Sequence, residues 1–152
     1  MKKSLFSIIV ILCCGLMFSG CTKSGTPTIN PSMTAAIASY TFNADYIEPR
    51  LQKSQIADTG TTLFIDGYER SSGDKIEITV TKYTGAPGTY SIVQGQASAY
   101  YLHNNIRYTA TGGIVAIKDA SDNVITGYFN FTSASGVTIL NGNYVCGKPW
   151  VY

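Results

Sequence analysis

The segment Lys75-Ile76-Glu77-Ile78-Thr79-Val80-Thr81 decides the fold class of this 152-residue chain. Its three β-branched apolar residues alternate with charged and hydroxyl residues, so they share one face of an extended strand. A strand with one apolar and one polar face is typical of an antiparallel sheet, because parallel sheets are covered on both faces. Ser71-Ser72-Gly73-Asp74 precedes it and predicts a turn to a partner strand over residues 61–68.

The same pattern continues along the chain. Segments rich in Thr, Tyr, Ile and Val alternate with clusters of Gly, Asn, Asp and Ser, and no long window shows a helical apolar stripe. Strands joined by tight turns pair mostly with their neighbours, so we expect an all-β fold. The prediction is a single antiparallel meander of about eight or nine strands, closed into a barrel or folded into a sandwich to protect its edges, with the barrel preferred. The strands expected from residue 61 onward are 61–68, 75–81, 89–93, 97–102, 106–110, 114–118, 124–132 and 137–144.

The first twenty residues predict export. Lys2 and Lys3 precede an apolar run over residues 5–18, which is shorter than the roughly 20 residues that a membrane-spanning helix needs. The run ends in Phe18-Ser19-Gly20-Cys21, where small residues directly before a cysteine resemble the bacterial lipobox. We therefore expect a signal peptide over 1–20 and a diacylglyceryl group on Cys21, which anchors the protein to a membrane. A secreted protein cleaved elsewhere, or an uncleaved signal anchor, is the alternative.

The rest of the chain is expected to form a tether and one domain. Residues 21–33 comprise the lipidated cysteine and a polar stretch with two prolines and a glycine, which is typical of a flexible linker. Residues 34–152 have the size of a single domain with its own core. The two cysteines of the signal peptide are removed and Cys21 carries lipid, so Cys146 has no disulfide partner and is expected to be a small buried residue.

Charge argues against a nucleic-acid partner. Removal of Lys2 and Lys3 with the signal peptide leaves nine Lys and Arg against nine Asp and Glu, so the mature chain has no net side-chain charge. No basic block interleaves with aromatic residues, as a nucleic-acid-binding surface would require. We expect the membrane, through the lipid on Cys21, and a glycan or peptide ligand as partners.

Aromatic residues suggest where such a ligand would bind. Tyr100 and Tyr101 are consecutive on a strand, so one ring must point away from the core, and beside His103 it could form a stacking platform for a sugar or peptide. Trp150, near the C-terminus, is a second candidate. His103 precedes Asn104-Asn105, which predicts a hairpin turn and a solvated histidine. It is the only histidine, so a two-histidine metal site is excluded, and we expect no metal and no cofactor.

A hydrolase is the alternative to a non-enzymatic binding or structural module. Asp58-Thr59-Gly60 resembles the active-site turn of aspartic proteases, but that mechanism needs two aspartates sharing a proton, and the chain contains one such triplet. A glycosidase needs two carboxyl groups about 5 to 10 Å apart. The acids available for this cluster around one predicted hairpin, where we expect them to solvate the turn; they are Asp66, Glu69, Asp74 and Glu77.

Five segments carry a resemblance to a known family: Met33-Thr34-Ala35-Ala36-Ile37, Phe42-Asn43-Ala44, Pro87-Gly88-Thr89-Tyr90, residues 125–132 and residues 139–144. Together they resemble a family of small, uncharacterised Bacteroidota lipoproteins. Ala38-Ser39 replaces the Asn-Gly pair of the family's first turn. The resemblance, over about residues 33–145, implies an all-β domain in the cell envelope and carries over no catalytic residue. Surface-displayed relatives have acidic residues after the lipidated cysteine; Thr22-Lys23-Ser24 lacks them, so we expect the periplasmic side of the outer membrane.

Overall fold

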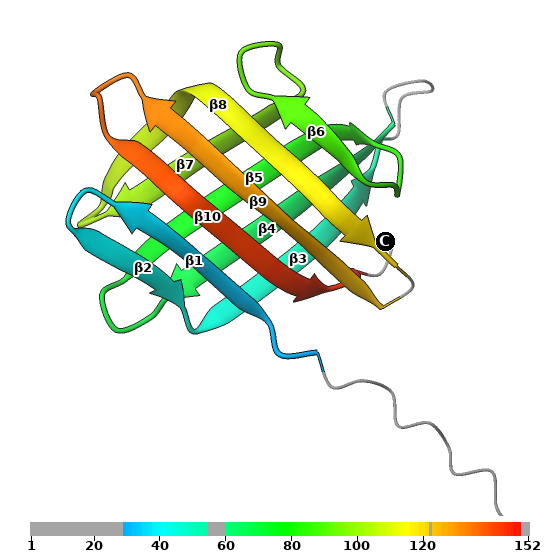
Figure 1. Ribbon diagram of the computed structural model, residues 1–152, viewed down its shortest axis with the longest axis horizontal. Coiled ribbons are helices and arrows are strands. Elements are labelled where there is room, and N and C mark those ends of the chain that lie inside the picture. Colours follow the sequence, from blue (N-terminus) through cyan, green and yellow to red (C-terminus); the bar gives the residue numbers. More distant parts are fainter. Residues whose placement is uncertain (1–28, 55–59, 122, 150–152) are drawn as a thin grey trace, which may run out of the picture.

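The computed structural model describes residues 29–54, 60–121 and 123–149, and these residues form ten strands and no helix (Figure 1). The expected all-β class is confirmed, with one or two strands more than anticipated. No helix within the described ranges is long and apolar enough to cross a membrane. The strands are β1 (Ser32–Ile37), β2 (Tyr40–Ala44), β3 (Tyr46–Lys53), β4 (Thr61–Glu69), β5 (Asp74–Tyr83), β6 (Gly88–Ser91), β7 (Ala97–His103), β8 (Ile106–Ala120), β9 (Val124–Ser133) and β10 (Thr138–Gly147).

The strands form one antiparallel sheet that curls into a nearly closed barrel. Their order is β2-β1-β10-β9-β8-β7-β5-β4-β3, and β6 pairs with β8 outside this path. In Figure 1 the wall made by β8, β9, β10 and β1 lies in front and crosses the strands of the rear wall, β7, β5, β4 and β3. The expected meander is therefore closed by β1, which pairs with β10.

The barrel has one seam, between β2 and β3. These two strands are the ends of the sheet, yet they are consecutive in the chain and separated only by Asp45. The backbone N–H of Asp45 donates to the carbonyl oxygen of Tyr68 on β4, at 2.9 Å. The chain thus crosses from one edge of the sheet to the other in a single residue.

Strand β8 contains the bend that turns one wall into the other. Its first part pairs with β7 and its second part with β9 and β6. The two separate strands expected over 106–110 and 114–118 are in fact one strand, and this prediction was wrong. Gly113 has φ +127°, and a Cβ there would lie 2.2 Å from the carbonyl oxygen of Asn130. Glycine at this position therefore bends the strand without ending it.

The folded part begins earlier than the expected start at residue 34. Strand β1 begins at Ser32, and the side chain of Met33 is fully buried. A Cβ on Gly67 of β4 would lie 2.5 Å from the Met33 Sδ, so the glycine makes room for the methionine. The end of the presumed tether is thus part of the core.

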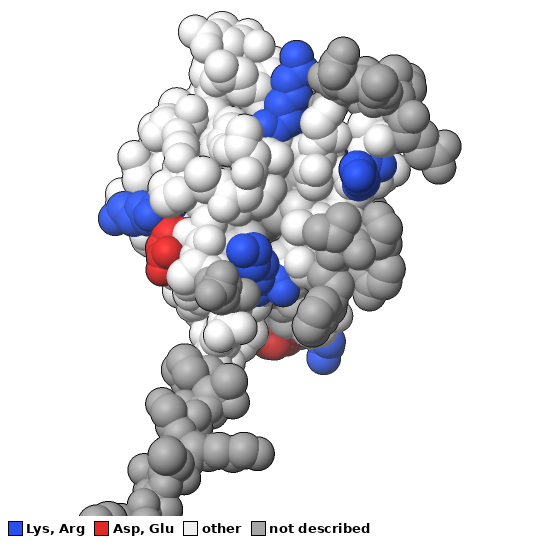
Figure 2. Space-filling view, turned by 90° about the vertical axis from the view of Figure 1, so that its right-hand side faces the viewer, with Lys and Arg blue, Asp and Glu red and all other residues white. Residues whose placement is uncertain are grey.

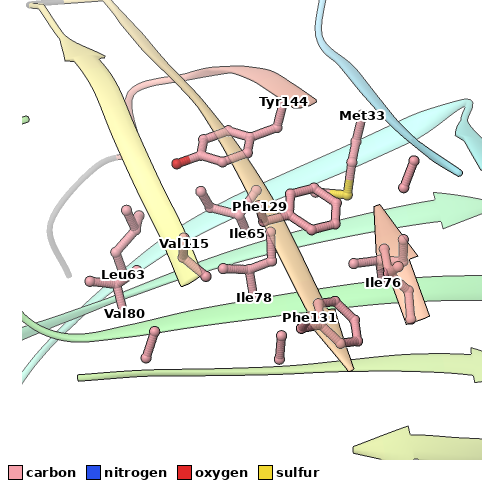
Figure 3. Packing of buried hydrophobic residues seen from close by; sticks show 14 of the residues in the cluster. Met33, Leu63, Ile65, Ile76, Ile78, Val80, Val115, Phe129, Phe131 and Tyr144 are labelled. Atoms are coloured by element: carbon pink, nitrogen blue, oxygen red, sulfur yellow. The ribbon is translucent and has the colours of Figure 1, made fainter. Parts of the chain in front are cut away.

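Large side chains fill the barrel interior (Figure 3). Ile76, Ile78 and Val80 of β5 are fully buried, which confirms the apolar face predicted from their alternation. Phe129 and Tyr144 approach from the opposite wall, and the Tyr144 hydroxyl donates to the carbonyl oxygen of Ala116 at 2.9 Å.

Cys146 is a free, fully buried cysteine, as expected. Burial raises the pKa of its thiol to about 12. At neutral pH the thiol is therefore protonated and behaves as a small apolar group.

Candidate functional site

Two adjoining pockets lie at the end of the barrel where the β1–β2, β7–β8 and β9–β10 turns meet, on the left in Figure 1. The first has a volume of about 230 Å³ and the second about 440 Å³. Ala38 and Val137 line both, so the two pockets adjoin, and together we call them the cleft. The first pocket is completed by Ile37, Tyr40, Tyr101, His103 and Tyr108, and the second by Ala36, Ser135, Gly136, Thr138 and Leu140.

Three stacked rings form one wall of the first pocket. Tyr101 and His103 are two positions apart on β7 and therefore share a face, and Tyr108 lies directly opposite Tyr101 on β8. The Tyr101 ring is stacked between the other two, with centroid distances of 5.7 Å to His103 and 5.9 Å to Tyr108. Tyr101 is buried while its two neighbours are half-buried, so the wall has a rigid centre and an accessible rim.

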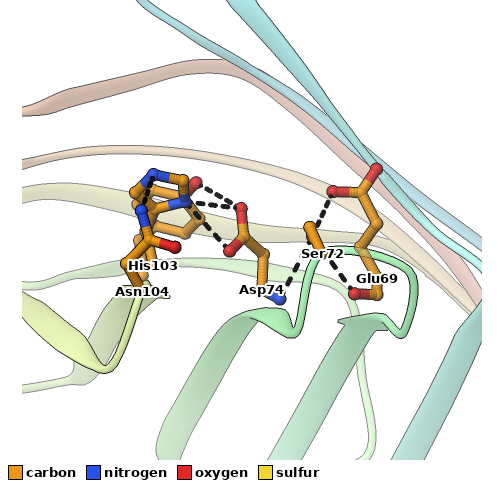
Figure 4. Close-up of polar contacts among 6 residues, drawn as sticks. Glu69, Ser72, Asp74, His103 and Asn104 are labelled. Atoms are coloured by element: carbon orange, nitrogen blue, oxygen red, sulfur yellow. Dashed lines mark hydrogen bonds and ion pairs between the residues drawn. The ribbon is translucent and has the colours of Figure 1, made fainter.

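A buried carboxylate fixes this wall from behind (Figure 4). Asp74, the first residue of β5, has a side chain that is 1% exposed. Its Oδ2 accepts a hydrogen bond of 2.7 Å from the Tyr101 hydroxyl, and the Nδ1 of His103 lies 2.9 Å from both carboxylate oxygens. Burial, together with the hydrogen bond to Asp74, raises the pKa of Tyr101. The phenol therefore stays protonated and is a permanent donor to Asp74.

The second ring nitrogen of His103 has a partner of its own. The Nε2 lies 3.0 Å from the side-chain nitrogen of Asn104, an NH₂ group that can only donate. In the neutral ring, Nε2 is thus the acceptor and Nδ1 carries the proton that is donated to Asp74. A carboxylate–histidine pair can serve as a general base when a nucleophile lies at the free nitrogen. Here an amide occupies that place, so the geometry supports binding rather than nucleophilic catalysis.

The structure corrects the prediction for His103. The asparagines after it do form the expected turn, with positive φ values of 49° for Asn104 and 63° for Asn105. The histidine side chain, however, is not simply solvated: it is 44% exposed and lies against the buried carboxylate of Asp74. The turn was predictable from the asparagines, but the partner of the histidine comes from another hairpin.

Tyr100 lies on the outer face of the barrel, away from His103. Its hydroxyl donates to Glu77 Oε2 at 2.7 Å, and the guanidinium of Arg107 lies 3.8 Å from its ring centroid. The outward-facing ring was expected beside the histidine; the structure places the inward-facing Tyr101 there instead. Tyr101 and His103 are thus brought together, and Tyr100 is separate from them. Trp150, Asp58 and Thr59 lie outside the described residues.

The expectation that the acidic residues only solvate a turn was wrong for two of them. Asp74 is buried at the cleft, and Asp66 is buried on the outer face, where its Oδ2 lies 2.6 Å from Arg50 and 3.3 Å from Lys75. Lys75 also bonds Glu77 at 2.8 Å. Burial alone would raise the pKa of Glu77, but hydrogen bonds from Lys75 and Tyr100 outweigh it and lower the pKa. Asp66 and Glu77 are thus paired with cations on the outer face, and Asp74 is the carboxylate that belongs to the cleft.

Sequence reasoning missed the residues that the turns contribute. Tyr40, Tyr108 and Val137 join the cleft only because the barrel closes and brings three hairpin ends together. Tyr40 and Val137 have only one sequence signal, their position directly after a turn, and Tyr108 has none beyond its place on a strand. Within the part of the chain that the structure describes, no group of three His, Cys, Asp or Glu side chains is placed to hold a metal ion.

Comparisons of the chain with protein-family models, with curated proteins and with solved structures found no match.

Proposed function

We propose that this protein is a lipid-anchored envelope lipoprotein whose barrel binds a ligand in the cleft at the end of the barrel. The observation that carries the proposal is the composition of the cleft. Aliphatic side chains and three stacked rings surround an open space, and its polar groups are few: the Asp74-anchored His103, tyrosine hydroxyls and, in the second pocket, the hydroxyls of Ser135 and Thr138. Ligand sites typically combine a largely apolar lining with a few fixed polar groups.

The ligand that fits this lining best is a short peptide segment with an apolar side chain. Ile37, Ala38 and Val137 offer aliphatic contacts, and Leu140 extends them into the second pocket. A peptide also carries backbone groups that the rim can bind, since the Asn104 amide beside His103 is polar and exposed.

A glycan is the second candidate, favoured by the ring stack. Tyr101, His103 and Tyr108 lie nearly parallel, with interplanar angles of 20° and 22°, and all three line the first pocket. The apolar face of a sugar ring packs on aromatic rings, and a tyrosine hydroxyl such as that of Tyr108 can bond sugar hydroxyls.

A titration with two matched variants tests the cleft. Tyr40 lines the first pocket and is 38% exposed, whereas Tyr46, 43% exposed, lies outside both pockets. The purified protein is screened against short peptides and envelope glycans by calorimetry. Tyr40→Ser is expected to weaken binding about tenfold, as loss of an aromatic contact does, and Tyr46→Ser to leave it unchanged. If no ligand binds, or if both variants lose affinity equally, the proposal that the cleft binds a ligand is refuted.

The anchor is tested separately. We propose that Cys21 carries the lipid and that the barrel faces the periplasm from the outer membrane, on the strength of the lipobox-like sequence before it. Cells are labelled with radioactive palmitate, and Cys21→Ala is compared with the unchanged chain. Label is expected on the unchanged chain and not on the variant; equal labelling would reject acylation at this residue.

A further inference from the structure

The end of the barrel opposite the cleft carries four exposed lysines. Lys53 ends β3, Lys82 lies next to the end of β5, Lys118 lies near the end of β8, and Lys148 follows β10. We call this set the lysine end; it lies on the right in Figure 1, and Figure 2 views it directly, with Lys and Arg side chains spread over the described surface. The cleft-forming turns lie at the other end of the same strands.

The ammonium groups of the lysine end are not neutralised by the rest of the described chain. None of them forms an ion pair with a described residue, although Lys118 packs over the ring of Tyr128 and Asp119 follows it in the sequence. The other described cations are held by local partners: Arg50 and Lys75 by Asp66, Arg70 by Asp45, and Arg107 by the Tyr100 ring. Five cations therefore form no ion pair within the described residues, and four of these five, all except Arg107, lie together at one end of the barrel.

The N-terminal segment joins the barrel at this same end. Strand β1 begins at Ser32, which pairs with Val145 near the end of β10, so the chain between Cys21 and the barrel leaves from beside Lys148. That connection has ten residues, 22–31, and spans at most about 35 Å when fully extended. Cys21, and whatever holds it, is therefore attached through the lysine end of the barrel and lies within this reach of it.

We infer that the lysine end rests on anionic phospholipid headgroups, so that the cleft at the opposite end points away from the membrane. This inference depends on the lipid anchor at Cys21 proposed above. Each lysine close to an anionic lipid surface strengthens binding by about fivefold. A short tether keeps the barrel at a high effective concentration beside the surface, so even weak attraction orients it. Two acidic residues, Asp58 and Asp122, lie outside the described residues. Every variant below retains them, so they do not affect the comparison between variants.

Lysine footprinting on vesicles tests the inference. The acylated protein is reconstituted into vesicles of neutral phosphatidylcholine or of phosphatidylcholine with phosphatidylglycerol, and a water-soluble amine reagent labels the lysines, which mass spectrometry quantifies one by one. All four lysines are expected to react several-fold more slowly on the anionic vesicles. The difference should vanish in 1 M salt, where the screening length is about 3 Å.

Two double variants provide the control. Lys53→Gln with Lys148→Gln removes two charges from the lysine end and should restore fast labelling of Lys82 and Lys118 on anionic vesicles. Arg70→Gln with Arg107→Gln removes two charges elsewhere and should leave the protection intact. If the unchanged protein is labelled equally on both kinds of vesicle, the inference about the lysine end is overturned. That result would not contradict the proposed acylation of Cys21 or the proposed ligand binding in the cleft. If mass analysis of the N-terminal peptide finds no acyl group on Cys21, the anchor itself fails, and the inference with it.

Discussion

Removal of the Asp74 carboxylate is the most direct test of how the cleft is built. Asp74→Ala leaves the buried Tyr101 hydroxyl without its acceptor and releases His103. Tyr101→Phe removes only the hydroxyl and leaves Asp74 bonded to His103. If the hydrogen bond between Asp74 and Tyr101 holds the aromatic wall in place, the two substitutions must be strongly coupled.

The geometry gives the expected magnitudes. A hydrogen bond from a buried hydroxyl to a carboxylate contributes about 1.5–3 kcal/mol, so Tyr101→Phe should lower the free energy of unfolding by that amount. Asp74→Ala should cost about 3–5 kcal/mol, because it breaks a buried pair and leaves a buried donor unsatisfied. The pairing with His103 adds little, since that ring is 44% exposed and screened by solvent. The double variant should cost little more than Asp74→Ala alone, giving a coupling free energy of about 1–2 kcal/mol.

Urea unfolding followed by far-UV circular dichroism measures these differences, with the slopes of the transitions compared to confirm that the variants unfold alike. Tyr108→Phe serves as the control, because no described residue bonds the Tyr108 hydroxyl, and its effect should stay within about 0.5 kcal/mol. Additive losses from Asp74→Ala and Tyr101→Phe, or an Asp74→Ala variant as stable as the unchanged protein, would refute the role given to this carboxylate.

Three further predictions concern the core. Gly142→Ala should cost about 1–3 kcal/mol in urea unfolding, because its Cβ would lie 2.5 Å from the Phe129 ring, and a Phe129→Leu background should reduce that cost. Iodoacetamide at pH 8 should leave the Cys146 peptide unlabelled in the native protein and label it in urea; mass spectrometry reads the result, and rapid native labelling would contradict the burial of this thiol. Burial raises the pKa of Cys146 to about 12 and also raises that of Tyr144, so the native state keeps protons that the unfolded chain releases above about pH 9. The free energy of unfolding should therefore fall between pH 8 and pH 11, and less steeply in Cys146→Ala; urea midpoints across this range check both.

The strands of the barrel could be predicted because the alternation of apolar and polar residues that defines them is local in the sequence. Ile76, Ile78 and Val80 alternate strictly with polar residues, and Asn104-Asn105 specifies its turn whatever surrounds it. The wrong prediction of two separate strands on either side of Gly113 has the same origin, because it too used only the local sequence. A glycine that ends a strand and a glycine that bends one look alike in sequence, and only the pairing with both walls distinguishes them.

The cleft could not be predicted because it is assembled at a distance. Asp74 and His103 are 29 residues apart and meet through the register of β5 with β7, while Val137 arrives from a third hairpin. The alternation of Tyr100 and Tyr101 showed that one ring must point outward, but not which. That choice depends on register, because a shift of one residue exchanges the two faces of a strand.

The seam between β2 and β3 bears on how this protein avoids aggregating. Free strand edges invite pairing with another molecule. Here β3 carries Pro49, which has no N–H to offer an incoming strand, and β2 is only five residues long. Because Asp45 joins β2 to β3 covalently, the gap between these edge strands is closed at the end where the two strands meet. A foreign strand would have to separate β2 from β3, so the native barrel is protected against edge-to-edge polymerisation.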